Sequence, residues 1–155
     1  MSLNLRRNCC WVLVIFLAGS SAFATRPPKT KSTGMIEIVS LLPEAGSQVD
    51  QNTVIKAELR FSIANFQYKK NRYYISIQFM DSNTRASTFS DGEENTVQIE
   101  EQTGTVHMKY PLNIVWSNPK LRKPVTFYFF LHERTGRNVS VVLEQTEEIV
   151  YKVTE

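Results

Sequence analysis

The feature that most constrains the fold is a period of two in the apolar residues, seen most clearly in the stretch VIKAELRFSI at residues 54–63. Polar or charged side chains occupy the alternate positions of this stretch. Successive side chains of a β-strand point to opposite faces, so this alternation predicts a strand that is buried on one face and solvated on the other. The apolar face consists of Ile55, Ala57, Leu59, Phe61 and Ile63.

The same alternation recurs along most of the chain, and no segment shows a sustained helical period of apolar residues. Turn-forming residues rich in Gly, Pro, Asn and Asp separate the alternating runs. Seven to nine short strands at such spacing predict an all-β antiparallel sandwich. Besides residues 55–63, the predicted strands are 36–42, 73–79, 86–90, 97–100, 106–112, 125–131, 139–143 and 149–153, with turns expected at 43–46, 91–92, 103–104, 117–119 and 135–137.

One predicted strand differs from the others. Residues Phe127 to Leu131 are apolar at every position, so the strand has no polar face there. Strands with this composition are covered on both faces. We therefore expect this strand in the centre of a sheet, either covered on both sides or lining an interface.

The N-terminus has the three parts of a secretory signal peptide. Arg6 and Arg7 precede an apolar run at residues 9–19, and small residues follow it and end in Ala22-Phe23-Ala24. The apolar run is about half the roughly 20 residues that a membrane-spanning helix needs. We therefore expect cleavage between Ala24 and Thr25, with the mature protein secreted or periplasmic and without a membrane span.

This cleavage divides the chain into three parts: a signal peptide at 1–24, a flexible basic leader containing prolines at 25–34, and one β-sandwich domain at 35–155. Cys9 and Cys10 leave with the signal peptide, and no cysteine follows them. An exported domain without disulfides favours a bacterial source. The mature chain keeps 16 basic and 15 acidic residues, so its net charge gives no reason to expect nucleic-acid binding.

A resemblance is carried by residues 41–61, LLPEAGSQVDQNTVIKAELRF, in which Pro43, Gly46 and Val49 precede the alternating strand. This stretch resembles the opening of the immunoglobulin-like modules of bacterial surface and periplasmic proteins. Gly104-Thr105-Val106 and Pro124-Val125 are similar to strand openings in such modules. The resemblance implies a fold and no particular activity, and the Cys, Trp and Cys core of antibody domains is absent.

No arrangement of residues in the sequence predicts catalysis, a metal site or a cofactor. Without cysteine, the mature chain has neither a thiol nucleophile nor thiolate ligands, and it contains no G-x-S-x-G motif. His107 and His132 are the only histidines, whereas a zinc site needs three or four ligands. By the alternation, His132 shares a face with Thr126, Tyr128 and Phe130. We expect both histidines to be ordinary strand residues.

The most suggestive binding motif is FQYKKNRYY at residues 66–74, where aromatic rings alternate with cations. Such a stretch suits sugars, single-stranded nucleic acid or an acidic protein surface. A polar hairpin loop is the favoured explanation, because the loops of a sandwich normally carry Lys, Asn and Arg. A second basic turn lies at residues 120–123, and convergence of the two would favour a binding site. The candidate partner-binding residues are Tyr68, Lys69, Lys70, Arg72, Tyr74, Lys120, Arg122 and Lys123.

These observations predict an exported, non-catalytic binding or assembly module whose partner is another protein or an envelope component. The alternative is a secreted effector or a protein similar to peptidase inhibitors, which would act through the loops of the sandwich. An exposed cluster formed by the two basic segments would favour this alternative.

Overall fold

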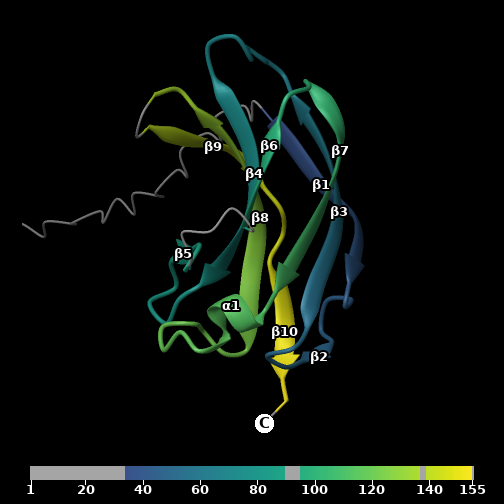
Figure 1. The fold of residues 1–155 in the computed structure, drawn as a ribbon, viewed down its shortest axis with the longest axis vertical. Helices are drawn as coiled ribbons and strands as arrows, with labels where there is room; N and C mark the ends of the chain where they lie inside the picture. The colour runs from purple at the N-terminus through teal and green to yellow at the C-terminus, as the bar shows by residue number, and fades with distance from the viewer. Residues whose placement is uncertain (1–33, 90–94, 137–138, 155) are drawn as a thin grey trace, which may run out of the picture.

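A computed structural model describes residues 34–89, 95–136 and 139–154. These residues form ten strands and one short helix (Figure 1). The first strands are β1 (Gly34–Leu42), β2 (Gln48–Val49), β3 (Val54–Ile63), β4 (Arg72–Met80), β5 (Ala86–Ser87) and β6 (Thr96–Ile99). They are followed by β7 (Thr103–Pro111), α1 (Asn113–Trp116), β8 (Val125–Arg134), β9 (Ser140–Gln145) and β10 (Ile149–Val153).

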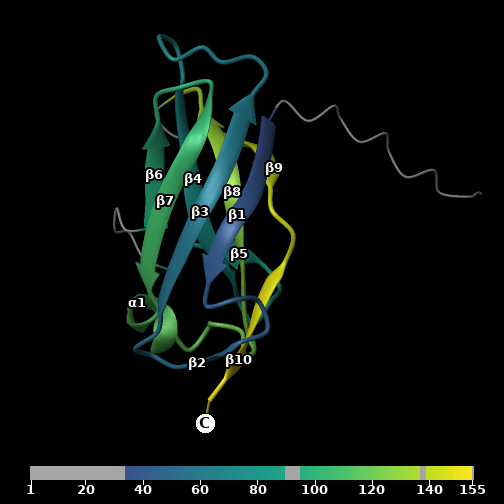
Figure 2. The ribbon, with the colours of Figure 1, turned by 90° about the vertical axis from the view of Figure 1, so that its right-hand side faces the viewer.

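The strands form two sheets that pack face to face (Figures 1 and 2). The smaller sheet has the order β1-β3-β7. The larger sheet has the order β2-β10-β8-β4-β5, with β6 also paired to β4 and β9 also paired to β8. All the pairings are antiparallel except that of β2 with β10, which is parallel. The chain is therefore all-β, as its alternating pattern predicts.

The core lies between the two sheets and is built from the inward positions of their strands. β3 alternates between buried and solvent-facing positions from Ile55 to Ile63, as the alternation predicts. Aromatic rings fill the centre, where Phe127 packs against Phe79 at 5.5 Å and against Tyr151 at 5.3 Å between ring centroids. Because these side chains are fully buried, they contribute to the hydrophobic stabilisation of the domain.

β8 is the central strand of the larger sheet, which confirms the expectation drawn from its apolar composition. It pairs with β4 along one edge and with β9 and then β10 along the other. β9 and β10 together form one interrupted partner strand. At the interruption, Thr146 is buried and its backbone N–H and side-chain oxygen bond to the backbone of Phe129.

The structure departs from the sequence-based expectations in three places. The described residues form ten strands, one more than expected. The sequence does not indicate β2, because this strand is only two residues long and pairs with β10, about a hundred positions away. α1 is a single helical turn, too short to show a period. Thr103 and Gly104, expected in a turn, instead begin β7, where they pair with Ser62 and Phe61 of β3.

The predicted signal peptide and its cleavage site at Ala24 and Thr25 lie outside the described residues, as does the expected turn at 91–92. β1 begins at Gly34, the residue that the sequence places last in the leader. In the part of the chain that the structure describes, no helix is both long and apolar enough to cross a membrane.

Candidate functional site

The first basic segment, residues 64–71, forms the loop between β3 and β4 at one end of the molecule (Figure 1). Tyr68, Lys69 and Lys70 are exposed there, as is Arg72 at the start of β4. The buried Tyr73 anchors the loop, because its hydroxyl accepts a hydrogen bond from the Gln67 backbone N–H at 3.0 Å. The loop therefore faces the solvent, while Tyr73 holds it in place.

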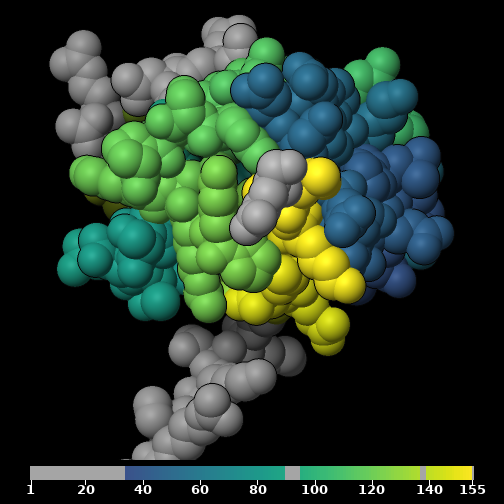
Figure 3. Space-filling view, turned by 90° about the horizontal axis from the view of Figure 1, so that it is seen from below, coloured from purple at the N-terminus to yellow at the C-terminus, as the bar shows by residue number. Residues whose placement is uncertain are grey.

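The second basic segment lies at the opposite end of the molecule. The Arg122 backbone N–H donates to the carbonyl of Met80, the last residue of β4. The loop at residues 64–71 instead leads into Arg72, the first residue of β4. Lys120, Arg122 and Lys123 are exposed, and the Lys123 ammonium lies over the Trp116 ring at 4.8 Å. In the view from below, the green segment around α1 shares this end with β2 and the end of β10 (Figure 3). The two basic segments do not converge, because the length of β4 separates them.

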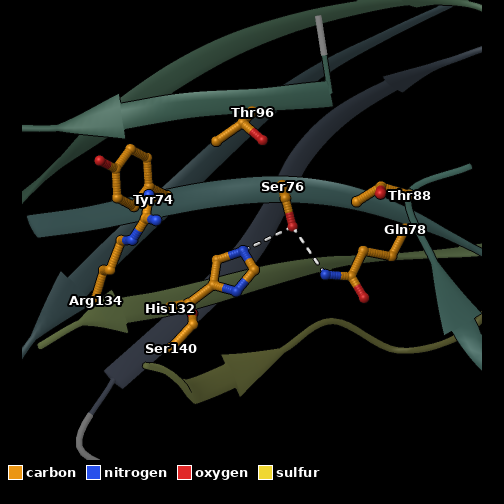
Figure 4. Close-up of a pocket in the computed structure, with 8 residues that line it drawn as sticks. All are labelled: Tyr74, Ser76, Gln78, Thr88, Thr96, His132, Arg134 and Ser140. Carbon is orange, nitrogen blue, oxygen red and sulfur yellow. Dashed lines mark hydrogen bonds between the residues drawn. The ribbon is translucent and has the colours of Figure 1, made fainter. Parts of the chain in front are cut away.

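Tyr74 belongs to neither basic cluster. It lies on β4, opposite His132 of β8, on the face of the larger sheet that points away from the core. Here the sheet surface is hollowed, with a cavity volume of about 280 Å³ (Figure 4). The hollow is lined by Tyr74, Ser76, Gln78, Thr88, Thr96, His132, Arg134 and Ser140. We call this site the outer-face hollow.

The floor of the outer-face hollow is a chain of hydrogen bonds between β4 and β8 (Figure 4). Ser76 Oγ lies 2.7 Å from His132 Nε2, and the Gln78 side-chain amide donates to Ser76 Oγ at 3.3 Å. Ser76 accepts from Gln78, so it donates its own proton when His132 Nε2 is unprotonated. Because Ser76 is only 2% exposed, these hydrogen bonds lie below the surface and hold the floor of the hollow in place.

Burial lowers the pKa of His132 below its ordinary value. The imidazole is therefore neutral at pH 7, and in the tautomer protonated on Nδ1 its Nε2 accepts a hydrogen bond from the Ser76 hydroxyl. The positive charge in the hollow comes from Arg134, whose side chain projects beside Tyr74 (Figure 4). None of the described residues that line the hollow is a carboxylate.

Aromatic side chains continue the outer face along β8 from the hollow. The Phe130 ring lies between those of Tyr128 and His132, with centroid distances of 6.0 and 6.4 Å. Tyr128 donates a hydrogen bond of 2.6 Å to Glu148, and this bond raises the pKa of its hydroxyl. Phe130 is only 8% exposed, although the described strands form no further sheet over this face. The side chains of the outer face thus shield one another.

A serine beside a histidine raises the possibility of nucleophilic catalysis. In catalytic triads a third group orients the histidine, commonly a carboxylate on the second ring nitrogen. Among the described residues, His132 has one hydrogen-bond partner, Ser76. The arrangement is suited to binding, because it offers fixed hydroxyl, amide and imidazole groups, one guanidinium and the flat ring of Tyr74.

His107, the other histidine of the chain, is remote from the hollow. It is exposed on β7, where it pairs with Glu58 of β3 in the smaller sheet. The two histidines thus lie on opposite sheets and do not form a common site.

Comparison with models of known protein families finds no match. Comparison with curated proteins finds no similar sequence.

Of the residues that the sequence singles out for binding, only Tyr74 belongs to the outer-face hollow. The alternation correctly places His132 on one face with Tyr128 and Phe130 but indicates no function for it. Ser76, Gln78 and Arg134 were missed, because the contact between Ser76 and His132 joins positions 56 residues apart and depends on the register between β4 and β8. The available signal was the absence of a polar face in residues 127–131.

Proposed function

We propose that this protein is an exported, non-catalytic binding module with an immunoglobulin-like fold, and that the outer-face hollow is its ligand site. The ligand class that fits best is a small sugar-like molecule with an acidic group. The observation that carries the proposal is the composition of the hollow: hydrogen-bonding side chains, one cation and an aromatic ring converge on it, and no described lining residue is acidic. Pockets that combine a few fixed polar groups with an aromatic surface are typical of ligand sites.

The strand order supports the immunoglobulin-like fold. In constant-type immunoglobulin domains, strands one, two, four and five in chain order share one sheet, and strands three, six and seven share the other. Here β1, β3 and β7 form one sheet, while β4, β8 and β10 are neighbours in the other. β9 and β10 together count as the last strand, β6 is the fourth strand and pairs with β4 in the larger sheet, and β2 and β5 are two-residue additions. Export is supported by the signal-like pattern at residues 1–24.

Each group of the hollow has a part in this recognition. The Arg134 guanidinium pairs with the acidic group of the ligand, for which its fork of donors is suited. The ring of Tyr74 offers a flat apolar face to a sugar ring. The Gln78 amide and the hydroxyls of Thr88 and Thr96 supply donors and acceptors for ligand hydroxyls.

The test is a titration of the labelled protein with glucuronic acid, N-acetylneuraminic acid and neutral galactose, followed by NMR. We expect the acidic sugars to shift the backbone signals of Ser76, His132 and Arg134 in a saturable way, and galactose to shift them less. Arg134→Gln removes the preference for the acidic sugars. The matched control is Arg60→Gln on the smaller sheet, which leaves it unchanged. Equal shifts in the wild type and Arg134→Gln, or no saturable shifts, would overturn the proposed ligand class.

Catalysis is tested on the same variants. We expect no hydrolysis of p-nitrophenyl esters above the background rate, and no difference between the wild type and Ser76→Ala. Turnover that disappears in both Ser76→Ala and His132→Gln would show that the Ser76–His132 pair is a catalytic dyad, and the binding proposal would then be wrong.

The second candidate function, an effector or inhibitor acting through loops, is favoured by one observation. The loop at residues 64–71 presents Tyr68, Lys69 and Lys70 to solvent while Tyr73 holds its base. The two basic segments do not form one cluster, because residues 120–123 lie at the other end of the molecule, and this speaks against the candidate. Charge reversal of Lys69 and Lys70 to Glu separates the candidates, because it abolishes capture of a protein partner but leaves sugar binding intact.

A further inference from the structure

A groove of about 600 Å³ runs along the side of the molecule between the two sheets. One wall is the second half of β1, and the other is the connection from β9 to β10. The groove is distinct from the outer-face hollow and shares no residue with it. Its lining residues are Ile38, Val39, Ser40, Leu41, Leu42, Glu44, Ala45, Glu147, Glu148 and Ile149.

Two irregularities of the backbone line the groove from opposite sides. β1 has a register shift between Ile38 and Ser40, where its pairing with β3 skips Val39. On the other side, residues 146–148 interrupt the strand formed by β9 and β10. β1 is also an edge strand, because β3 is its only partner among the described strands. An unprotected edge of this kind is open to pairing with another chain.

The groove combines an apolar floor with an acidic rim. Leu42 is 59% exposed and Val39 is 42% exposed, high values for large aliphatic side chains. Glu44, Glu147 and Glu148 form the rim, and none of the three makes an ion pair with a described residue. The groove therefore suits an extended segment that carries both apolar groups and positive charge.

A segment with these properties directly precedes β1. Residues 25–33, TRPPKTKST, contain Arg26, Lys29, Lys31 and two adjacent prolines but no acidic residue. In the extended polyproline II conformation that prolines favour, nine residues span roughly 28 Å. The nine residues of β1 span about 30 Å at the usual strand rise. Folded back along β1, the segment would bring Arg26 and the prolines level with the groove.

We propose that residues 25–33 of the same chain occupy this groove. The two prolines pack on Val39 and Leu42, while Arg26 and Lys29 pair with the glutamates of the rim. Proline has no backbone N–H to donate, so packing and charge pairing hold the segment instead of a regular strand ladder. The occupied groove protects the edge of β1 from pairing with other chains.

The experiment uses residues 25–155, which contain the whole described core and no native cysteine. A spin label is attached to a cysteine introduced by Pro27→Cys. We expect the label to broaden the NMR signals of Val39, Leu42 and Ile149 but not those of His107 and Lys109 on β7. Intramolecular occupation predicts broadening that is independent of protein concentration.

Charge reversal tests the contribution of the rim. The double variant Glu44→Lys, Glu147→Lys should abolish the broadening at Leu42 and Ile149. Glu100→Lys, Glu101→Lys is the matched control, because it makes the same charge change beyond the end of β6 and should leave the broadening intact. Unchanged strand signals in the double variants show that the domain remains folded.

Three results would overturn the proposal: no broadening in the groove, broadening that grows with protein concentration, which would indicate a second copy as the occupant, or broadening that survives reversal of the rim. None of these results bears on sugar binding, so this proposal and the proposed function can fail separately.

Discussion

The outward faces of the two sheets differ although both belong to strands with buried inner faces. On the smaller sheet the outward positions carry exposed charged and polar side chains, such as Lys56, Arg60 and Lys109. On the larger sheet, Ser76, Thr126 and Phe130 are buried although they face outward. Solvation of an outer face is the ordinary outcome for an antiparallel sheet. The buried, hydrogen-bonded outer face of β4 and β8 is therefore the exception, and it is the part of the surface that we propose as the ligand site.

The largest expected effect comes from two adjacent phenylalanines of β8. Phe129 is fully buried between the sheets, so Phe129→Ala should lower the free energy of unfolding by about 3–5 kcal/mol. Phe130 points to the outer face, where its removal leaves no enclosed cavity, and Phe130→Ala should cost about 1.5–3 kcal/mol. Urea unfolding measures both. Equal losses would show that the two faces of β8 are equivalent.

The next effect concerns the floor of the outer-face hollow. Ser76→Ala leaves His132 Nε2 and the Gln78 amide without their shared partner, and should cost about 1–3 kcal/mol in urea unfolding. Ser62 on β3 is a matched control on the smaller sheet, and Ser62→Ala should change stability by less than about 0.5 kcal/mol. If the two serine variants lose the same amount, the hydrogen-bond chain contributes nothing specific.

A smaller effect is a dependence of stability on pH. The folded-state pKa of His132 is lowered, so the unfolded chain binds more protons in the range below the ordinary histidine pKa. Stability should therefore fall as the pH is lowered through about 6.5 and level off once the folded-state pKa has been passed. In His132→Gln, unfolding curves measured between pH 7.5 and 5 should no longer show this loss of stability. His107→Gln should retain it, because His132 is intact, and its loss in that variant would refute the assignment.

The smallest expected effect is on the outer face of the smaller sheet. Arg60 and Glu37 form an ion pair at 3.4 Å, with both side chains more than half exposed. Exposed pairs of this kind contribute little, so Glu37→Gln should change the free energy of unfolding by less than about 1 kcal/mol, and less still in high salt. A larger loss in calorimetry would mean that this face is not freely substitutable.

Sequence reasoning recovers most of the fold, because the period of two is a local property. The alternating residues of β3 and the apolar run of β8 suffice to place these strands and to identify β8 as central. β2 was missed, because its two residues gain order only from pairing with β10. α1 was missed, because one helical turn with Val115 as its only buried residue shows no period.

The candidate site was less predictable than the fold. Tyr74 and His132 are opposite each other only because β4 and β8 pair in one register, and a shift of one residue would turn every side chain to the other face. The basic loops attract attention in the sequence because cations and tyrosines are adjacent there. Their separation follows from the direction of β4, which the composition of a loop does not reveal.

The parallel pairing of β2 with β10 has a mechanical consequence. Three backbone hydrogen bonds of 2.8 to 3.0 Å join the two segments: Gly46 N–H to Val150 O, Lys152 N–H to Ser47 O, and Thr154 N–H to Val49 O. The start of β1 and the end of β10 lie at opposite ends of the molecule (Figure 2). Tension applied between these ends would load the three bonds in shear, all at once, whereas a hairpin opened from its tip loses its bonds one after another. The short strand β2 would thus act as a clamp that resists extension of the domain.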